Sequence, residues 1–401
     1  MADGALFTLD PSQERAIDLL VREPFGIITG APGTGKTTCL RAGLDRIADE
    51  RPDDEVELAA STGKASKRLS DATGREARTV HRLLDYNPRY GFQRNADNPI
   101  DADLVVVDEA SMLDVELSGA LFDALDPKRT RLVLVGDMHQ LPSVGPGRVF
   151  GDLIESGLVP VARLTTLHRA AQRSWVCRSA PVILDGQKPD LKRRDDFVFV
   201  DVGDAHTAAR VAVGMVASVL PGRGIEGAMV LSPQNTGHAG VEALNAALQD
   251  RLNPPRMGES KFGSLRWSDR VIQTKNDYDR AIFNGEIGDV VSIDRGKVTV
   301  DFEGRRVDFD AEGAGRLRLA YALTVHRAQG SEYPWCVVIC HSTHTRMLTR
   351  QLLYTAITRA KEGVVLVGDA KGLARALKNT RDVERKTSLI ERLKAEGEGN
   401  A

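Results

Sequence analysis

The sequence has few cysteines, few aromatic residues and no long apolar run. Its 401 residues include four cysteines and 5% aromatic side chains, with 54 basic and 56 acidic residues for a formal net charge of −2. Four scattered cysteines exclude a disulfide framework or a zinc site, so we expect buried thiols. No stretch approaches the roughly 18 to 20 apolar residues of a membrane span, and the amino terminus lacks the basic start of a secretion signal. We therefore expect a cytoplasmic protein with no membrane partner.

The spacing of apolar residues predicts two α/β domains. Short β-branched runs alternate with Ala- and Leu-rich amphipathic stretches, which is typical of parallel sheets covered by helices. The expected strands form two series: 25–29, 56–60, 104–107 and 131–135, then 228–231, 335–340 and 364–367. We also expect a helix over 240–252 and a charged, partly frayed helix after Lys386.

Two segments interrupt this alternation. Residues 85–101 are rich in Asn, Pro, Gly and aromatic side chains and predict a small hairpin projecting from the first domain. Residues 269–310 contain closely spaced short strands, which predict a small β-barrel inserted in the second domain. Its turns are expected at Gly285, Gly288, Gly296 and Gly304.

The strongest local signal is a complete phosphate-binding loop, G-x-x-x-x-G-K-T, over residues 30–37. It follows an expected strand and precedes an expected helix. Its glycines let the backbone wrap a phosphate, Lys36 can reach the terminal phosphates, and the Thr37 hydroxyl can ligate Mg²⁺. The loop therefore predicts a site for ATP with Mg²⁺.

A second signal is the apolar strand at 104–107, which ends in the adjacent carboxylates Asp108 and Glu109. After a phosphate loop, this pattern indicates a Mg²⁺-anchoring carboxylate at Asp108 and a base at Glu109 that deprotonates the attacking water. Hydrolysis also needs a cation at the γ-phosphate, for which Arg169 and Arg359 are candidates. Spacing alone does not distinguish these two from surface arginines.

Taken in order, the motifs resemble those of the superfamily 1 helicases, and most closely the RecD/Dda-like branch, superfamily 1B. The matching segments cover almost the whole chain: 9–13, 30–37, 60–69, 79–84, 108–111, 136–147, 164–169, 321–332 and 354–361. The resemblance implies an α/β fold of two RecA-like parallel-sheet domains. The implied boundaries are 1–84 and 102–165 for the first domain, 85–101 for a pin hairpin, 166–268 and 311–401 for the second domain, and 269–310 for an SH3-like β-barrel.

The resemblance also implies roles at the ATP site. Gln13 matches the glutamine that reads adenine, and Gln140 matches the sensor of the γ-phosphate. Arg169 and Arg359 match the two arginine fingers, and His168 stands where relatives often carry an aromatic side chain against adenine. The other residues implied to surround the nucleotide are Gly33, Thr34, Gly35, Lys36, Thr37, Thr38, Gly330 and Glu332.

In this family a single DNA strand crosses both α/β domains through phosphate and stacking contacts, which need few cations. The implied contacts are Thr62, Lys64, His81, Pro142, Ser232, Asn276, Thr324 and His326. Simpler interpretations stay open. Lys64, Lys67 and Arg68 could form a solvated helix face. His326 could be a core histidine, and turn chemistry could explain Asn276.

The hairpin resembles the pin of this family, the wedge that separates the strands of a duplex. Tyr86, Pro88, Tyr90 and Phe92 could stack on the first broken base pair. They could also form a small core of their own.

The sequence thus predicts a monomeric, ATP- and Mg²⁺-dependent DNA helicase in a bacterial cytosol or a phage-infected cell. Its substrates would be single-stranded DNA and forked or tailed duplexes, and only the resemblance implies movement from 5′ to 3′. One alternative is a translocase that displaces proteins without processive unwinding. A second is a nucleotide-dependent switch that hydrolyses ATP slowly. The full set of catalytic residues argues against this second alternative. The near-neutral charge excludes a basic coating protein and predicts a weak salt dependence of DNA binding.

Overall fold

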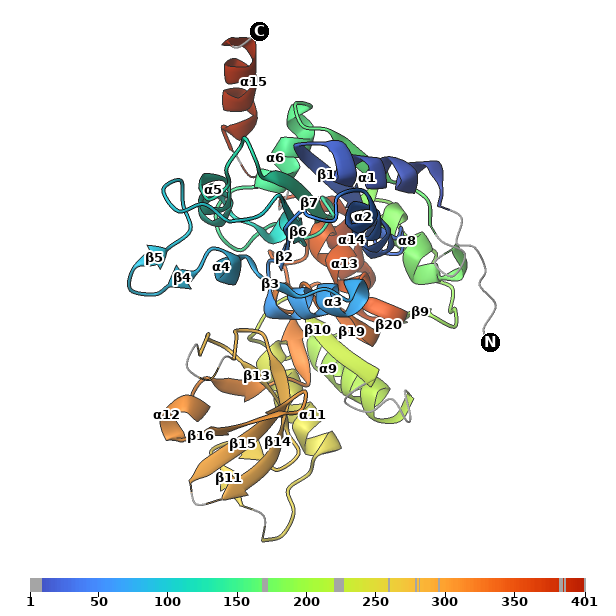
Figure 1. Cartoon of the computed structure of the whole chain (residues 1–401). Helices are drawn as coiled ribbons and strands as arrows, with labels where there is room; N and C mark the ends of the chain where they lie inside the picture. Colours follow the sequence, from blue (N-terminus) through green and yellow to red (C-terminus); the bar gives the residue numbers. More distant parts are fainter. Residues whose placement is uncertain are drawn as a thin grey trace, which may run out of the picture. The chain divides into compact units, whose positions relative to one another are not determined.

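The computed structural model describes residues 9–167, 172–219, 227–258, 260–277, 280, 282–294, 296–381, 385 and 387–399. The chain divides into two compact units, Met1–Arg173 with Val383–Ala401, and Ser174–Asp382. Each unit contains its own parallel sheet, as the alternation of β-branched and amphipathic segments predicts (Figure 1).

A six-stranded sheet forms the centre of the first unit, and all its strand pairs are parallel. The four inner strands match the predicted ones. The two edge strands, β3 and β8, escape prediction because they are short and less buried. In spatial order the strands are β3 (Ala77–Thr79), β2 (Val56–Ala60), β6 (Leu104–Asp108), β7 (Arg131–Gly136), β1 (Phe25–Gly30) and β8 (Val161–Leu164).

Helices cover both faces of this sheet because successive strand residues point to opposite faces. Leu104 and Val106 pack with α1, α2 and α3, whereas Val105 and Val107 pack with α4, α5 and α6. This division explains why the strands are apolar throughout instead of alternating. The helices are α1 (Pro11–Arg22), α2 (Lys36–Glu50), α3 (Gly63–Thr73), α4 (Val80–Leu83), α5 (Val115–Asp123) and α6 (Val149–Ser156).

The carboxyl-terminal helix α15 (Leu389–Gly399) belongs to the first unit, although the sequence assigns residues 311–401 to the second domain. It packs on α6, and Leu389 and Leu393 contact the core on that side of the sheet. Arg385 donates hydrogen bonds to the carbonyl oxygens of Gly145 (2.8 Å) and Gly147 (2.9 Å). The apolar face of a helix does not specify its partner, so the predicted boundary differs from the observed one at this end.

Residues 86–92 form the predicted hairpin in the first unit. Its strands, β4 (Tyr86–Asn87) and β5 (Gly91–Phe92), are antiparallel, with Tyr86 opposite Phe92. Gly91 has a φ of 76°, which suits the residue that closes the turn.

A five-stranded parallel sheet forms the centre of the second unit. Three strands match the predicted series, whereas β18 and the edge strand β9 are not predicted. In spatial order the strands are β18 (Ala322–Thr324), β10 (Ala228–Ser232), β19 (Tyr333–Cys340), β20 (Ala360–Gly368) and β9 (Phe197–Asp201).

Helices α9 and α11 share one apolar core with strands of this sheet, to which Ala208 and Leu244 contribute. Helices α8 and α14 pack on α13, which also contacts β19 and β20. A π-helical segment, η2 (Met215–Val219), follows α9, and α11 begins after Gly240 as predicted. The helices are α8 (Trp175–Leu184), α9 (Ala205–Gly214), α11 (Val241–Leu252), α13 (Arg350–Ile357) and α14 (Ala370–Lys378).

The predicted insertion in the second unit is a five-stranded antiparallel sheet of order β16-β15-β14-β13-β17, with α12 beside it (Figure 1). It extends past the predicted boundary at 310 to include β17. Gly285, Gly296 and Gly304 have positive φ at turns, as expected, but Gly288 lies within β14. There a Cβ atom would meet the carbonyl oxygen of Asp301 at 2.6 Å. The elements are β13 (Arg270–Gln273), β14 (Ile287–Asp294), β15 (Lys297–Phe302), β16 (Arg305–Phe309), α12 (Ala311–Ala314) and β17 (Leu317–Leu319). A separate two-stranded sheet, β11 (Lys261–Phe262) and β12 (Leu265–Arg266), precedes them in the chain.

Within the described part of the chain, no helix combines the length and the apolar character needed to cross a membrane. Cys39, Cys336 and Cys340 are buried, as expected, whereas Cys177 is only half-buried.

Candidate functional site

The phosphate-binding loop connects β1 to α2, as its sequence predicts. Gly33 and Gly35 have φ values of 80° and 87°, a left-handed conformation that glycine adopts without strain. Gly35 caps α2 without a side-chain hydrogen bond, so the first amides of the helix can face an anion. The Lys36 ammonium donates to the carbonyl oxygen of Gly30 at 2.6 Å, and the Thr34 hydroxyl donates to that of Ala31 at 2.7 Å. Thr37 and Thr38 lie in the first turn of α2.

The paired carboxylates lie at the carboxyl end of β6. Asp108 and Glu109 are only 5% and 6% exposed. Burial, and next the charge of Glu109, raises the pKa of Asp108 to about 6, while Arg68 and Lys36 act in the opposite direction. Glu109 has a φ of 52°, a backbone conformation that is strained for a non-glycine residue and is common at functional sites. The pair is therefore a buried concentration of negative charge.

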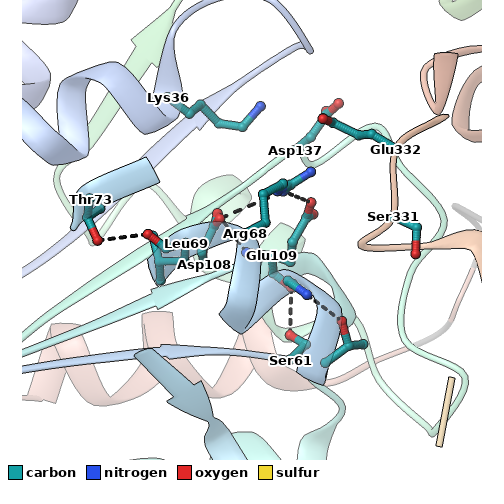
Figure 2. Close-up of polar contacts among 12 residues, drawn as sticks. Lys36, Ser61, Arg68, Leu69, Thr73, Asp108, Glu109, Asp137, Ser331 and Glu332 are labelled. Carbon is teal, nitrogen blue, oxygen red and sulfur yellow. Dashed lines mark hydrogen bonds and ion pairs between the residues drawn. The ribbon is translucent and has the colours of Figure 1, made fainter. Parts of the chain in front are cut away.

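Arg68 of α3 is a further site residue, which the sequence leaves on a solvated helix face. Its Nη2 atom lies 2.8 Å from Oε1 of Glu109 and 3.9 Å from Oδ2 of Asp108 (Figure 2). The Arg68 side chain is 29% exposed, against 7% for each carboxylate. The contact joins residues far apart in the sequence, so no local pattern could have revealed it.

Asp137, directly after β7, is a second site residue that is not among the predicted ones. It is 1% exposed and accepts hydrogen bonds from the amide of His139 (3.0 Å) and from Nε2 of Gln140 (3.4 Å). Because β6 and β7 are parallel neighbours, Asp137 and Gln140 lie at the same sheet edge as Asp108. A carboxylate immediately after an apolar strand was the signal that could have identified Asp137.

Gln13 is fully buried at the start of α1, between that helix and the phosphate-binding loop. Its Oε1 atom accepts a hydrogen bond from the amide of Asp10 (3.1 Å), which completes a capping box. Its Nε2 atom donates to the carbonyl oxygen of Thr34 (3.4 Å). The structure thus links Gln13 to the phosphate loop, and its role in reading adenine stays a prediction.

Arg359, one of the predicted arginine fingers, is 2% exposed and follows α13 in the second unit. It donates to the carbonyl oxygens of Thr355 (3.2 Å) and Ser331 (3.3 Å). Among the residues that the structure describes, it forms no ion pair with a carboxylate. A buried cation without a counter-charge costs free energy, which an arriving anion would offset.

The remaining predicted ATP residues differ in their surroundings. Gly330 is buried and has a φ of 72°, whereas Glu332 is exposed and lies 3.5 Å from Lys361 in an ion pair. His168 and Arg169 lie outside the described residues, so their roles stay predictions.

The candidate strand contacts in the first unit lie on α3, α4 and the loop after β7. Thr62 caps α3 through a hydrogen bond from the amide of Ala65 (3.2 Å), and Lys64 lies in the first turn of that helix. Pro142 is half-buried. Burial lowers the pKa of His81 despite the nearby charges of Asp114 and Glu116. At neutral pH the His81 ring is therefore uncharged, which suits a stacking contact better than a phosphate contact.

The candidate strand contacts in the second unit are more mixed. Ser232 is completely buried and donates to the carbonyl oxygen of Ala239 (2.8 Å), which argues against the predicted strand contact. The Thr324 hydroxyl accepts a hydrogen bond from the amide of Arg327 (3.3 Å) in the short helix η3 (His326–Ala328), and His326 is half-buried. Asn276 is exposed and accepts from the amide of Asn284 (2.8 Å), as turn chemistry would explain.

The hairpin divides its aromatic residues between two environments. The rings of Tyr86 and Phe92 are 4.9 Å apart, and His81 lies within 6.0 Å of both. Tyr90 is 68% exposed, with the Arg89 guanidinium 5.5 Å from its ring centre. Pro88 lies in the turn beside them. Two of the four predicted wedge residues thus form a small core, and Tyr90 is presented outward.

Three family models match the chain. Residues 13–146 match an AAA domain, residues 319–367 match a UvrD-like helicase C-terminal domain, and residues 244–302 match the SH3 domain of ATP-dependent RecD-like DNA helicases.

Curated relatives extend over nearly the whole chain. It is 39% identical to the ATP-dependent RecD2 DNA helicase of Deinococcus radiodurans, over 96% of this chain and 53% of that protein. It is 33% identical to the RecBCD enzyme subunit RecD of Mycolicibacterium smegmatis, over 96% of this chain and 75% of the relative. The chain therefore spans about half the length of the first relative and three quarters of the second.

Solved structures support the same fold. The Pif1 helicase from Candida albicans has a TM-score of 0.57 at 17% identity, covering 98% of this chain and 100% of the other. A Bacteroides Pif1 helicase, solved with ADP-AlF3 and single-stranded DNA, has a TM-score of 0.56 at 17% identity, covering 98% of each chain.

Proposed function

Because the chain belongs to the RecD family of DNA helicases, we propose that it couples ATP hydrolysis to the unwinding of duplex DNA. The observation that carries the proposal is the carboxyl edge of the first sheet. There the phosphate loop follows β1, the Asp108–Glu109 pair ends β6, and Gln140 follows β7. These groups are the ones needed to bind phosphate, hold a cation, activate water and sense the γ-phosphate.

The residues at this edge fit a Mg²⁺ ion. Asp108 is a buried carboxylate whose raised pKa reflects unfavourable negative charge, and the Thr37 hydroxyl begins α2. One carboxylate and one hydroxyl suit Mg²⁺, which keeps several waters in its shell. When bound, the ion would neutralise charge on the β- and γ-phosphates, and Asp108 and Thr37 would hold it.

Different side chains of the protein are proposed to bind the phosphates, accept the proton and stabilise the transition state. Lys36 exchanges the Gly30 carbonyl for phosphate oxygens, and Glu109 accepts the proton of the attacking water. Arg359 is proposed to supply positive charge to the γ-phosphate in the transition state. Arg169 is proposed as the second finger, and Gln13 and His168 as the residues that contact adenine.

Helix α3 and the loop after β7 are proposed to grip a single DNA strand through Thr62, Lys64 and Pro142. Thr324 and His326 would provide contacts on the second unit. Repeated ATP binding and hydrolysis would move a monomer along the strand from 5′ to 3′, with the hairpin dividing the duplex ahead.

Two measurements test this proposal. The first is the ATPase rate with and without single-stranded DNA, because an unstimulated rate would leave only the nucleotide-switch alternative. The second is unwinding of duplexes that carry either a 5′ or a 3′ single-stranded tail, in ATP and Mg²⁺. We expect unwinding only from the 5′ tail, and a preference for the 3′ tail would refute the proposed polarity.

A further inference from the structure

Helix α3 carries residues of both the proposed DNA-binding site and the ATP site of the first unit. Thr62 at its cap and Lys64 in its first turn are the proposed strand contacts, and Arg68 lies one helical turn beyond Lys64. Residues four apart lie on the same face of a helix. Buried Ala65 and Leu69 fix α3 to the sheet, so Lys64 and Arg68 are held in a defined relation to each other.

The contact between Arg68 and Glu109 joins a movable partner to a fixed one. Glu109 is buried, and its amide donates to Oδ1 of Asp108 at 2.9 Å. The Arg68 side chain is 29% exposed and reaches the carboxylate through a long, flexible stem. If the pair separates, Arg68 is therefore the partner that leaves.

A second link ties the same segment to Glu109. The Ser61 hydroxyl, just before α3, donates to the carbonyl oxygen of Glu109 at 2.8 Å (Figure 2). The preceding strand pairs in parallel with β6, with Ala60 opposite Asp108. The backbone and the side chain of Glu109 thus both contact the segment that is proposed to bind DNA.

We propose that Arg68 is a positioning residue shared between Glu109 and a phosphate of the bound DNA strand. Without DNA, Arg68 holds the Glu109 carboxylate and restrains it from accepting the proton of water. A strand on α3 offers Arg68 a phosphate, which the guanidinium binds with the same geometry as a carboxylate. Glu109 is then released. This inference rests on the proposed function and supplies a route by which DNA would stimulate hydrolysis.

The test follows from linkage, because two ligands that compete for one side chain weaken each other's binding equally. The affinity for a fluorescent single-stranded oligonucleotide is measured by anisotropy, without nucleotide, for the wild type, Glu109→Gln, Arg68→Gln and the double variant. We expect Glu109→Gln to bind DNA about fivefold more tightly than the wild type, within the usual range of such couplings. In the Arg68→Gln background the same change should have no effect.

The double variant distinguishes competition between Glu109 and DNA for Arg68 from a simple effect of removing the negative charge of Glu109. If Glu109→Gln tightens binding equally with and without Arg68, or not at all, the shared-residue proposal is wrong. Lys67→Gln is the matched control, since Lys67 is an exposed cation on the same helix and its loss should leave the Glu109→Gln effect intact.

A second readout is the turnover of ATP without DNA. Arg68→Gln should raise the basal kcat about fivefold at an unchanged KM and reduce the stimulation by DNA. Arg68→Lys keeps a cation near Glu109, so its basal kcat should return most of the way to the wild-type value. A fall in basal kcat for a folded Arg68→Gln variant would mean that Arg68 assists hydrolysis, which contradicts the proposal. A wild type that binds no DNA would instead refute the proposed function.

Discussion

The ammonium group of Lys36 lies 2.6 Å from the carbonyl oxygen of Gly30, at the opposite end of the same phosphate-binding loop. Without nucleotide, the Lys36 ammonium is thus hydrogen-bonded to the backbone of its own loop. The ammonium also donates to the carbonyl oxygen of Ala31 at 3.3 Å. A phosphate must replace these two acceptors, and the ion pair gained should exceed the neutral hydrogen bonds lost.

We therefore expect Lys36→Ala to reduce ATP turnover by a factor of about 10² or more, as when one transition-state contact to the phosphates is lost. Thermal stability should change little because Lys36 is only half-buried. Steady-state ATPase assays and a thermal melt check both points. Lys128→Ala, at an exposed site on the same unit, is the control that should retain full activity.

Arg359→Met should separate stability from activity. The side chain is buried without an ion-pair partner among the described residues, so an apolar replacement of similar length should leave the chain as stable as before or more so. ATP turnover should fall by about 10³, as expected for an arginine finger, while nucleotide binding persists. Urea unfolding and single-turnover hydrolysis provide the measurements, and normal turnover would exclude Arg359 from the transition state.

The hairpin offers a test of unwinding against translocation. Tyr90→Ala should reduce unwinding of a forked duplex about tenfold through loss of one stacking contact, without affecting DNA-stimulated ATPase. Deleting residues 86–98 should abolish unwinding and again spare the ATPase. Loss of both activities in a folded deletion variant would contradict a wedge, and full unwinding would show that strand separation does not depend on the hairpin. Tyr86→Ala serves as a comparison, since its ring packs on Phe92 and its loss should loosen the hairpin itself.

Arg385 should control the attachment of the carboxyl-terminal helix. Its guanidinium bonds to three carbonyl oxygens of the loop after β7, those of Ser143, Gly145 and Gly147. Arg385→Ala should lower the free energy of local opening of residues 387–399 by about 2 kcal/mol, because hydrogen bonds to a charged group are lost. Amide hydrogen exchange measures this opening. Arg381→Ala, an exposed position nearby, should leave the exchange rates of α15 unchanged.

His344 should make the second unit sensitive to acid. Burial, and next the charge of His341, lowers the pKa of His344 to about 4, and an unfolded histidine titrates near 6.5. As the pH falls from 6.5 towards 4, the unfolded state gains a proton that the folded state does not, so stability decreases. The loss between pH 7 and pH 4.5 should be about 2 kcal/mol. Urea titrations at both pH values should show a smaller loss for His344→Gln, and an equal loss would identify another group as the cause.

Local chemistry explains what could be predicted from the sequence. The phosphate loop, the Asp108–Glu109 pair and the turns at Gly296 and Gly304 depend on backbone geometry within a few residues, and each carries its own signature. The inner strands of both sheets are apolar throughout because helices cover both faces, so their pattern is visible in one dimension. Short edge strands such as β3 are only partly buried and lack that pattern.

The sequence by itself thus determined the nucleotide chemistry, the two α/β units and the inserted hairpin. Only the tertiary structure decided which side chains surround that chemistry. It placed Arg68 against Glu109, buried Ser232 away from solvent, left Arg359 without a carboxylate in the described chain, and attached α15 to the first unit. Each of these depends on which distant segments pack together, and the free energy of packing belongs to the contact and not to either segment alone.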